Sequence, residues 1–160
     1  MIARELTTLQ REIEAYPTQE SIWLVPSGIA NSAGTLVLHL IGNLQYLIGT
    51  LLGNTGYMRH REAEFATRNV SREDLLSGIE ETIAVVQAAL PAVGEDRMAE
   101  TYPIEVAGVR VRTDDFLVHL CAHLAYHLGQ VDYHRRLLAA PGTVGAMAIP
   151  DLVTARRAAE

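Results

Sequence analysis

Histidine residues are crowded into one stretch near the end of the chain. The segment HLAYHLGQVDYH, residues 123–134, contains His123, His127 and His134, and His119 lies just before it. The whole chain has only six histidines. Imidazole nitrogen is a frequent ligand of zinc and of other divalent transition metals. The crowding therefore indicates a candidate metal site in this stretch.

Helical geometry limits which of these histidines can share an ion. On one helix all four fall within an arc of roughly 80 degrees, at the border of an apolar stripe. Two imidazoles four residues apart are separated by about 6 Å of helical rise and can bind one ion, whereas His119 and His127 are separated by about 12 Å. The spacing leaves two candidate pairs, His119 with His123 and His123 with His127. His134 lies nearly two turns further on and is expected to take no part.

A pair of imidazoles is an incomplete metal site, so another helix must supply a third ligand. His39 is the best candidate, because it lies beside Leu36 and Leu40 at the border of an inward-facing apolar stripe. Three neutral imidazoles suit a divalent zinc, nickel or iron ion with an open position for water. Such a water becomes a nucleophile near neutral pH, or a substrate thiolate or carbonyl takes its place.

The rest of the sequence predicts the helices that must position these residues. Hydrophobic spacing and capping residues predict four long helices: residues 2–15; a helix capped by Asn31 or Ser32 and closed at Gly53-Asn54; a helix from the cap Ser71 to about Leu90; and residues 114–139, capped by Thr113. The alternating segment YPIEVAGVRVRT predicts a small hairpin at Ala107-Gly108, and a short helix is expected from about Pro150. The fold class predicted is all-α, a four-helix bundle with short extra helices, forming one domain over residues 1–160.

Composition narrows the class of protein. The chain is 49% hydrophobic and 20% charged, with a formal net charge of -6. Nucleic-acid-binding modules usually carry a basic face, so no nucleic-acid partner is expected. A single cysteine, Cys121, excludes an internal disulfide and a thiolate-rich zinc knot. The N-terminus has no apolar signal-peptide run, and the most apolar helix is interrupted by polar residues, so the prediction is a cytoplasmic protein without a membrane partner.

Several catalytic motifs are absent. The chain contains no H-E-x-x-H zinc-protease motif, no Glu-x-x-His pair of di-iron bundles, no phosphate-binding G-x-x-x-x-G-K loop and no G-x-S-x-G nucleophile elbow. Asp115 lies four residues before His119 but is given no catalytic role. No acidic residue lies three or four positions from His39, His123 or His127. The sequence therefore predicts no general base, and the catalytic residues beyond the metal ligands stay unassigned.

Two separated motifs resemble the DinB-like superfamily of metal-dependent helical-bundle proteins. HLAYHLGQVDYHRRLL resembles the last core helix of that family, where two histidines four apart precede a Gly-Gln pair. NSAGTLVLHLIGNLQYLIG is similar to its second helix, where one histidine supplies the first ligand. The form HLIGN, with the later RHREAEF, is similar to a branch of unknown function. The resemblance covers about residues 31–138.

The resemblance implies a ligand set, a topology and a range of activities. It selects His39, His123 and His127 as the ligands and leaves His119 outside them. It implies an up-down-down-up bundle, a homodimer and a nickel, zinc or iron ion. Relatives include thiol-dependent transferases and isomerases that use low-molecular-weight thiols, so a small thiol or another small molecule is the expected partner.

Other polar residues are candidates for the surroundings of the ion. Asn43 and Tyr46 share a face with His39 and could hydrogen-bond a metal-bound water or substrate; the alternative is that they complete buried polar bonding between helices. Gln130, three residues after His127, could orient that ligand. Four charged residues could line the mouth of the site, or form a salt-bridged surface instead: Arg59, Arg61, Glu62 and Glu64.

Two functions remain open on the sequence. The first is a metal-dependent enzyme, a thiol-dependent S-transferase or a hydrolase, in which the open face of the ion activates a thiol or water. The alternative is a non-enzymatic helical bundle whose metal site is structural or vestigial. An open coordination position favours the enzyme, and a closed ligand shell favours the structural role.

Overall fold

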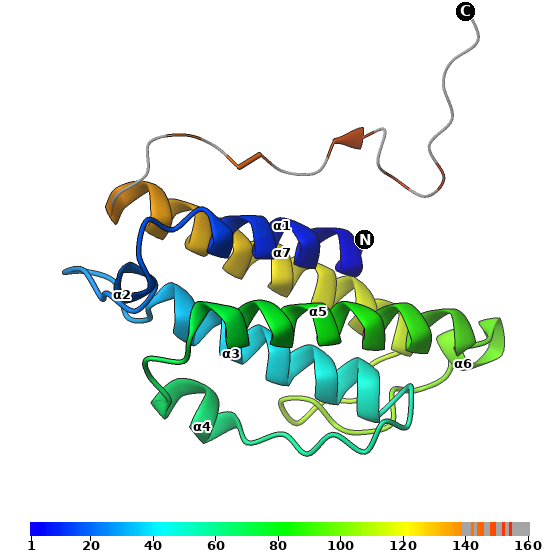
Figure 1. Ribbon diagram of the computed structural model, residues 1–160. Coiled ribbons are helices and arrows are strands. Elements are labelled where there is room, and N and C mark those ends of the chain that lie inside the picture. The colour runs from blue at the N-terminus through cyan, green and yellow to red at the C-terminus, as the bar shows by residue number, and fades with distance from the viewer. Residues whose placement is uncertain (139–141, 143, 146–147, 150–151, 153, 155–160) are drawn as a thin grey trace, which may run out of the picture.

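Helices account for the ordered elements of the chain in the computed structural model, which describes residues 1–138, 142, 144, 145, 148, 149, 152 and 154 (Figure 1). The four long helices of this part are α1 (Ile2–Glu14), α3 (Ala33–Leu44), α5 (Arg72–Ala89) and α7 (Thr113–Leu138). The shorter ones are α2 (Gln19–Ile22), the π-helical η1 (Gln45–Thr50), α4 (Arg61–Ala66), the 3-10 turn η2 (Leu90–Ala92) and α6 (Glu95–Ala99). No β-strand occurs in the described residues, which confirms the all-α class.

The long helices pack as a bundle around one core. Helix α1 packs against α5 and α7, and α3 packs against the same two helices. In Figure 1, α1 and α7 run in one direction and α3 and α5 in the other. The short helix α4 lies against the outer side of α3. This packing brings the middle of α3 next to the middle of α7, where the candidate ligands lie.

Serine caps define where two of the long helices begin. The Ser32 hydroxyl oxygen accepts a hydrogen bond from the backbone N–H of Thr35 at 3.2 Å, and Ser71 accepts one from Asp74 at 3.0 Å. Each cap satisfies an N–H group that has no partner inside its helix. Both caps confirm the sequence prediction. The long second helix, however, changes to π-helical hydrogen bonding at Gln45.

Apolar side chains at helical spacing form the core. The largest fully buried ones include Leu6 and Leu9 of α1, Leu40 and Leu44 of α3, Leu75 and Ile79 of α5, and Leu120 and Leu124 of α7. Each such side chain contributes about 1.5–3 kcal/mol by leaving water. These residues hold α3 and α7 at a fixed separation, and that separation decides which histidines can meet.

Helix α5 packs against the bundle with one face and exposes the other to solvent, as a helix of a soluble helical domain does. The segment Arg72–Ala92 is long and apolar enough to cross a membrane by length and composition alone. Its inner face is buried against the bundle, whereas Glu80 and Glu81 are exposed on its outer face. A core helix of a bundle shows this one-sided pattern.

A hairpin-like loop precedes α7. Antiparallel bridges pair Thr101 with Arg112 and Val106 with Val109, and Ala107 and Gly108 at the tip have φ angles of 51° and 78°. Two consecutive positive φ angles are typical of a type I′ turn. The predicted hairpin is therefore present as two isolated bridges.

Two local predictions near this region have different outcomes. The prediction that Thr113 caps α7 is wrong, because α7 already includes Thr113 and its hydroxyl donates to the Glu100 carbonyl at 3.1 Å. That bond fixes the base of the hairpin-like loop to the start of the helix. The short helix expected after residue 150 lies outside the described residues, apart from 152 and 154.

Candidate metal centre

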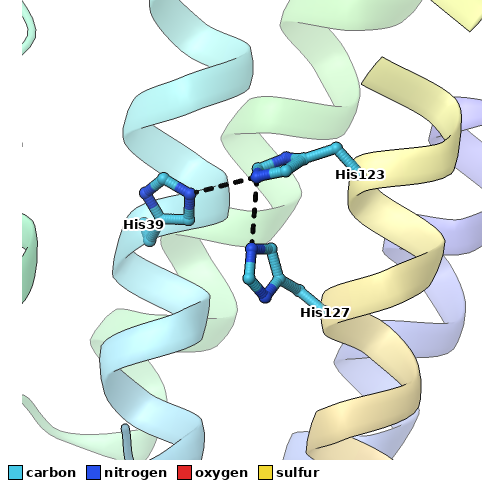
Figure 2. A group of neighbouring side chains, drawn as sticks. All are labelled: His39, His123 and His127. Atoms are coloured by element: carbon cyan, nitrogen blue, oxygen red, sulfur yellow. Dashed lines mark hydrogen bonds between the residues drawn. The ribbon is translucent and has the colours of Figure 1, made fainter. Parts of the chain in front are cut away.

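Three histidines from two helices converge in the bundle. His39 comes from α3, and His123 and His127 come from successive turns of α7. Figure 2 shows the three rings facing one another across the space between the two helices. The Nε2 atom of His123 lies 3.1 Å from Nε2 of His127 and 3.4 Å from Nε2 of His39. The tertiary structure thus brings together the three residues that the resemblance selected.

The separations of these nitrogens suit a shared metal ion. Nitrogen ligands at about 2.0–2.1 Å from a tetrahedral zinc ion lie about 3.3–3.4 Å from one another. One ligand atom from each of the three histidines lies within 4.8 Å of the other two. His39 is buried, with 6% of its surface exposed, whereas His123 and His127 are half-buried. The residues present therefore fit one divalent ion held by three imidazole nitrogens.

Hydrogen bonds at the opposite ring nitrogens fix the orientation of two ligands. Nδ1 of His39 lies 3.0 Å from Oε2 of Glu64, and Nδ1 of His127 lies 2.7 Å from Oε1 of Gln130. Both oxygens are acceptors, so each Nδ1–H donates and each Nε2 keeps its lone pair for an ion. Gln130 therefore contacts His127 in the manner expected of an orienting residue.

His123 differs from its two neighbours. Its Nδ1 atom is buried and has no hydrogen-bond partner among the described residues. Burial, followed by the neighbouring His127 and His39 rings, lowers the pKa of His123 to about 4. Burial also lowers the pKa of His127, against a raising contribution from Gln130. Both rings are consequently unprotonated at neutral pH, which is the state that binds a metal.

Glu64 is the residue at this site that sequence reasoning missed. The sequence suggested the mouth of the site or a salt-bridged surface for this residue, but its side chain is buried, 7% exposed, and bonded to His39 and Arg59. Burial by itself raises the pKa of Glu64, but hydrogen bonds from Arg59 and His39 outweigh it and bring the pKa to about 2. Helical spacing could not reveal this contact, since Glu64 lies on a different helix. The signal available in the sequence was the presence of Arg59 and Glu64 in the segment RHREAEF, two opposite charges that can pair.

A cavity of about 270 Å³ adjoins His123. Asn43, Tyr46 and Arg59 line it on one side, and residues of the hairpin-like loop line it on another. Asn43 is 7% exposed, and its Oδ1 atom is buried without a hydrogen-bond partner in the described part of the chain. Oδ1 of Asn43 therefore makes no hydrogen bond between the described helices, in contrast to the alternative interpretation of this residue. A partly enclosed space with both polar and apolar lining residues therefore lies directly beside a candidate ligand.

Comparison with known proteins places the chain in a family. A model for a family of proteins of unknown function, DUF1572, matches residues 3–150. The chain belongs to this family. The crystal structure of a DinB-like protein from Bacillus cereus ATCC 10987 is similar in fold, with a TM-score of 0.68 and 18% sequence identity over 88% of this chain and 91% of that chain. This likeness confirms the fold that the resemblance to the DinB-like superfamily implied. A comparison with curated proteins found no match.

The remaining candidates in this DUF1572 protein are not among the three convergent histidines. His119 is exposed, its ring centroid lies 6.2 Å from that of His123, and it lines the cavity beside His123. Arg61 packs over the Phe65 ring at 5.1 Å and lines a separate surface hollow on α4, so it does not line the cavity beside His123. His134 is buried, with its ring nitrogens 2.6 Å from the Tyr16 hydroxyl and 2.9 Å from the Leu24 carbonyl.

The metal-free DUF1572 protein is expected to lose stability as the pH falls from 6.5 toward 4. The pKa of His123 is about 4 in the folded chain and near its ordinary value of 6.5 in the unfolded chain. Within that window the unfolded chain takes up a proton that the folded chain refuses, so the equilibrium shifts toward unfolding. The lowered pKa values of His127 and His134 act in the same direction.

Thermal unfolding at pH 7 and pH 5 measures this effect, with a chelator present to remove metal. A His123→Gln variant should show a smaller drop in melting temperature between the two pH values. An equal drop in both proteins would contradict the assignment of the effect to His123.

Proposed function

We propose that this chain is a metal-dependent enzyme in which His39, His123 and His127 bind one divalent ion through their Nε2 atoms. The observation that supports the proposal most strongly is the spacing of those atoms, 3.1 and 3.4 Å from the central His123. A bound ion of this kind supplies Lewis acidity that activates a thiol or a water molecule. Zinc, nickel and iron all accept such a ligand set.

The surroundings of the three histidines support a substrate position next to His123. Three protein ligands leave coordination positions open, which is the arrangement of catalytic rather than structural zinc sites. The cavity of about 270 Å³ reaches the same histidine, so a small molecule there would lie next to the ion. Asn43 and Tyr46 line that cavity and offer hydrogen bonds to it. We propose a thiol-dependent S-transfer or a hydrolysis, with a low-molecular-weight thiol as the preferred partner.

One observation favours the alternative of a structural metal in a non-enzymatic bundle. The carboxylate that contacts a candidate ligand, Glu64, accepts hydrogen bonds from both Arg59 and His39 and has a pKa of about 2. A general base needs a pKa closer to the working pH. Glu64 is therefore unsuited to accept a proton from a substrate, and an activated thiol or water would have to lose its proton elsewhere.

Cobalt substitution with a small thiol separates the two functions. Purified metal-free protein would be loaded with one equivalent of Co²⁺, and its visible and near-ultraviolet spectrum recorded with and without N-acetylcysteine. If the ion has an open position, a sulfur-to-cobalt charge-transfer band should appear and saturate as thiol is added. Stoichiometric cobalt whose spectrum does not change with N-acetylcysteine would contradict the enzyme and support the structural role.

The homodimer and the cytoplasmic location stay predictions. Helix α7 exposes apolar side chains, with Val118 at 70%, Tyr126 at 65% and Tyr133 at 73% of their surface open to solvent. An apolar helix face of this kind supports a contact with a second copy of the chain. Sedimentation analysis of the purified protein would measure whether a dimer forms.

A further inference from the structure

The geometry assigns Glu64 as the positioning residue for His39, held in place by Arg59 and admitted by the missing side chain of Gly42. This inference rests on the proposed metal site and deepens it, because it explains which nitrogen of His39 is offered to an ion. The contact joins two helices that are separated in sequence, since His39 lies on α3 and Glu64 on α4.

Both oxygens of Glu64 are engaged on one side by a guanidinium group. Nε of Arg59 donates to Oε1 at 2.7 Å, and Nη2 of Arg59 donates to Oε2 at 2.9 Å. Two parallel N–H···O bonds of this kind fix a carboxylate in position as well as in charge. The pair is also necessary because a buried carboxylate without a cation is costly. Arg59 therefore fixes where the carboxylate points.

The fixed carboxylate determines the proton position on His39. A neutral imidazole carries one proton, and an acceptor beside Nδ1 keeps that proton on Nδ1. Oε2 of Glu64 lies 3.0 Å from Nδ1, closer than the donor Nη2 of Arg59 at 3.4 Å. The shorter contact is to the acceptor, so the proton stays on Nδ1 and Nε2 is left with its lone pair, 3.4 Å from Nε2 of His123. If the proton moved to Nε2, His39 could not bind an ion shared with His123.

Gly42 provides the space for this arrangement. It lies three residues after His39, so both occupy neighbouring positions on one side of α3. A Cβ atom at residue 42 would overlap Oε1 of Glu64 and lie 2.8 Å from its carboxyl carbon. Any side chain there would push the carboxylate away from His39. The HLIG segment of α3 and the Arg59–Glu64 pair therefore form one structural unit.

The three histidines consequently have unequal support. The difference lies at the Nδ1 atom of each ring. Nδ1 of His39 has a buried carboxylate as its partner, Nδ1 of His127 has the neutral amide of Gln130, and Nδ1 of His123 has no hydrogen-bond partner in the described residues. A carboxylate raises the basicity of a ligating imidazole more than an amide does. His39 is thus the ligand whose orientation and basicity the chain controls most closely.

The test compares variants of Glu64 by zinc affinity and by the proton position on His39. Glu64→Leu combined with Arg59→Met removes both charges together, so that neither is left buried and unpaired. We expect this double variant to bind Zn²⁺ about 10- to 100-fold more weakly than the unchanged protein, the usual cost of losing such a partner. In metal-free protein, ¹⁵N NMR of the histidine rings should show the His39 proton shifted from Nδ1 toward Nε2. Glu64→Gln keeps an acceptor near Nδ1 and should preserve the Nδ1 proton.

Matched controls separate this role from general effects of charge. Glu62→Gln removes an exposed negative charge from the same short helix without touching His39, and should leave both measurements unchanged. Gly42→Ala should weaken zinc binding in the same direction as the double variant. Wild-type zinc affinity together with an Nδ1 proton on His39 in the double variant would overturn the inference. If the unchanged protein bound no metal, the proposed function would fail, but the NMR measurement would still decide the role of Glu64.

Discussion

Replacing His123 by alanine is expected to abolish stoichiometric metal binding. His123 is the central member of the three, with its Nε2 atom 3.1 Å from that of His127 and 3.4 Å from that of His39. Its loss leaves two imidazoles on different helices without the ligand that lies between them. We expect the affinity for Zn²⁺ to fall by at least about 100-fold, because losing even an outer hydrogen-bond partner costs 10- to 100-fold.

Elemental analysis of protein purified without an affinity tag measures this change directly. His119→Ala is the matched control, because His119 lies one turn before His123 on α7, is exposed and is not among the three convergent residues. The control should retain about one metal ion per chain. Tight stoichiometric metal in His123→Ala, or its loss in His119→Ala, would exclude the proposed ligand set.

Replacing Arg135 by methionine is expected to destabilise the fold by about 3–5 kcal/mol, the usual cost of leaving one buried charge without its partner. Nε of Arg135 donates to Oε2 of Glu12 at 2.5 Å, and the two side chains are 2% and 3% exposed. This ion pair joins α7 to α1, whereas the three histidines lie between α7 and α3. The effect should appear in the free energy of unfolding measured with urea.

Two further variants test whether burial is the cause. Arg136→Met removes the neighbouring cation, which is 43% exposed and pairs with Asp132 at 3.3 Å, and should cost less than about 1 kcal/mol. Combining Arg135→Met with Glu12→Leu removes both buried charges and should recover most of the lost stability. A loss in Arg135→Met no larger than in Arg136→Met would show that the buried pair does not stabilise the bundle.

Local sequence signals predicted the helices well, because helix ends depend on nearby atoms. Ser32 and Ser71 bond the backbone three residues further on, so their capping roles are visible in the sequence. Thr113 also carries a hydroxyl group but has a different role, since that hydroxyl donates to the Glu100 carbonyl. The Glu100 carbonyl lies at the base of the hairpin-like loop, and helical periodicity does not predict the course of that loop.

The candidate metal site also has features that local spacing predicts and features that depend on helix packing. Spacing on one helix limited the ion to a pair that includes His123, and left His119 and His127 as equal alternatives. The family resemblance selected His127, and the packing of α3 against α7 gives the physical reason, because it sets which turn of α7 faces His39. The structure brings His127 to His39, with ring centroids 5.3 Å apart.

The sequence by itself determined an all-α chain with candidate imidazole ligands on two helices, because side-chain periodicity and capping are local properties. The tertiary structure alone decided that Glu64 reaches His39 from α4 and that Arg59 holds it there. These contacts depend on how the loop after η1 returns along α3 and on the space at Gly42. A buried carboxylate takes its role from the groups folded around it, and its position in the sequence does not specify them.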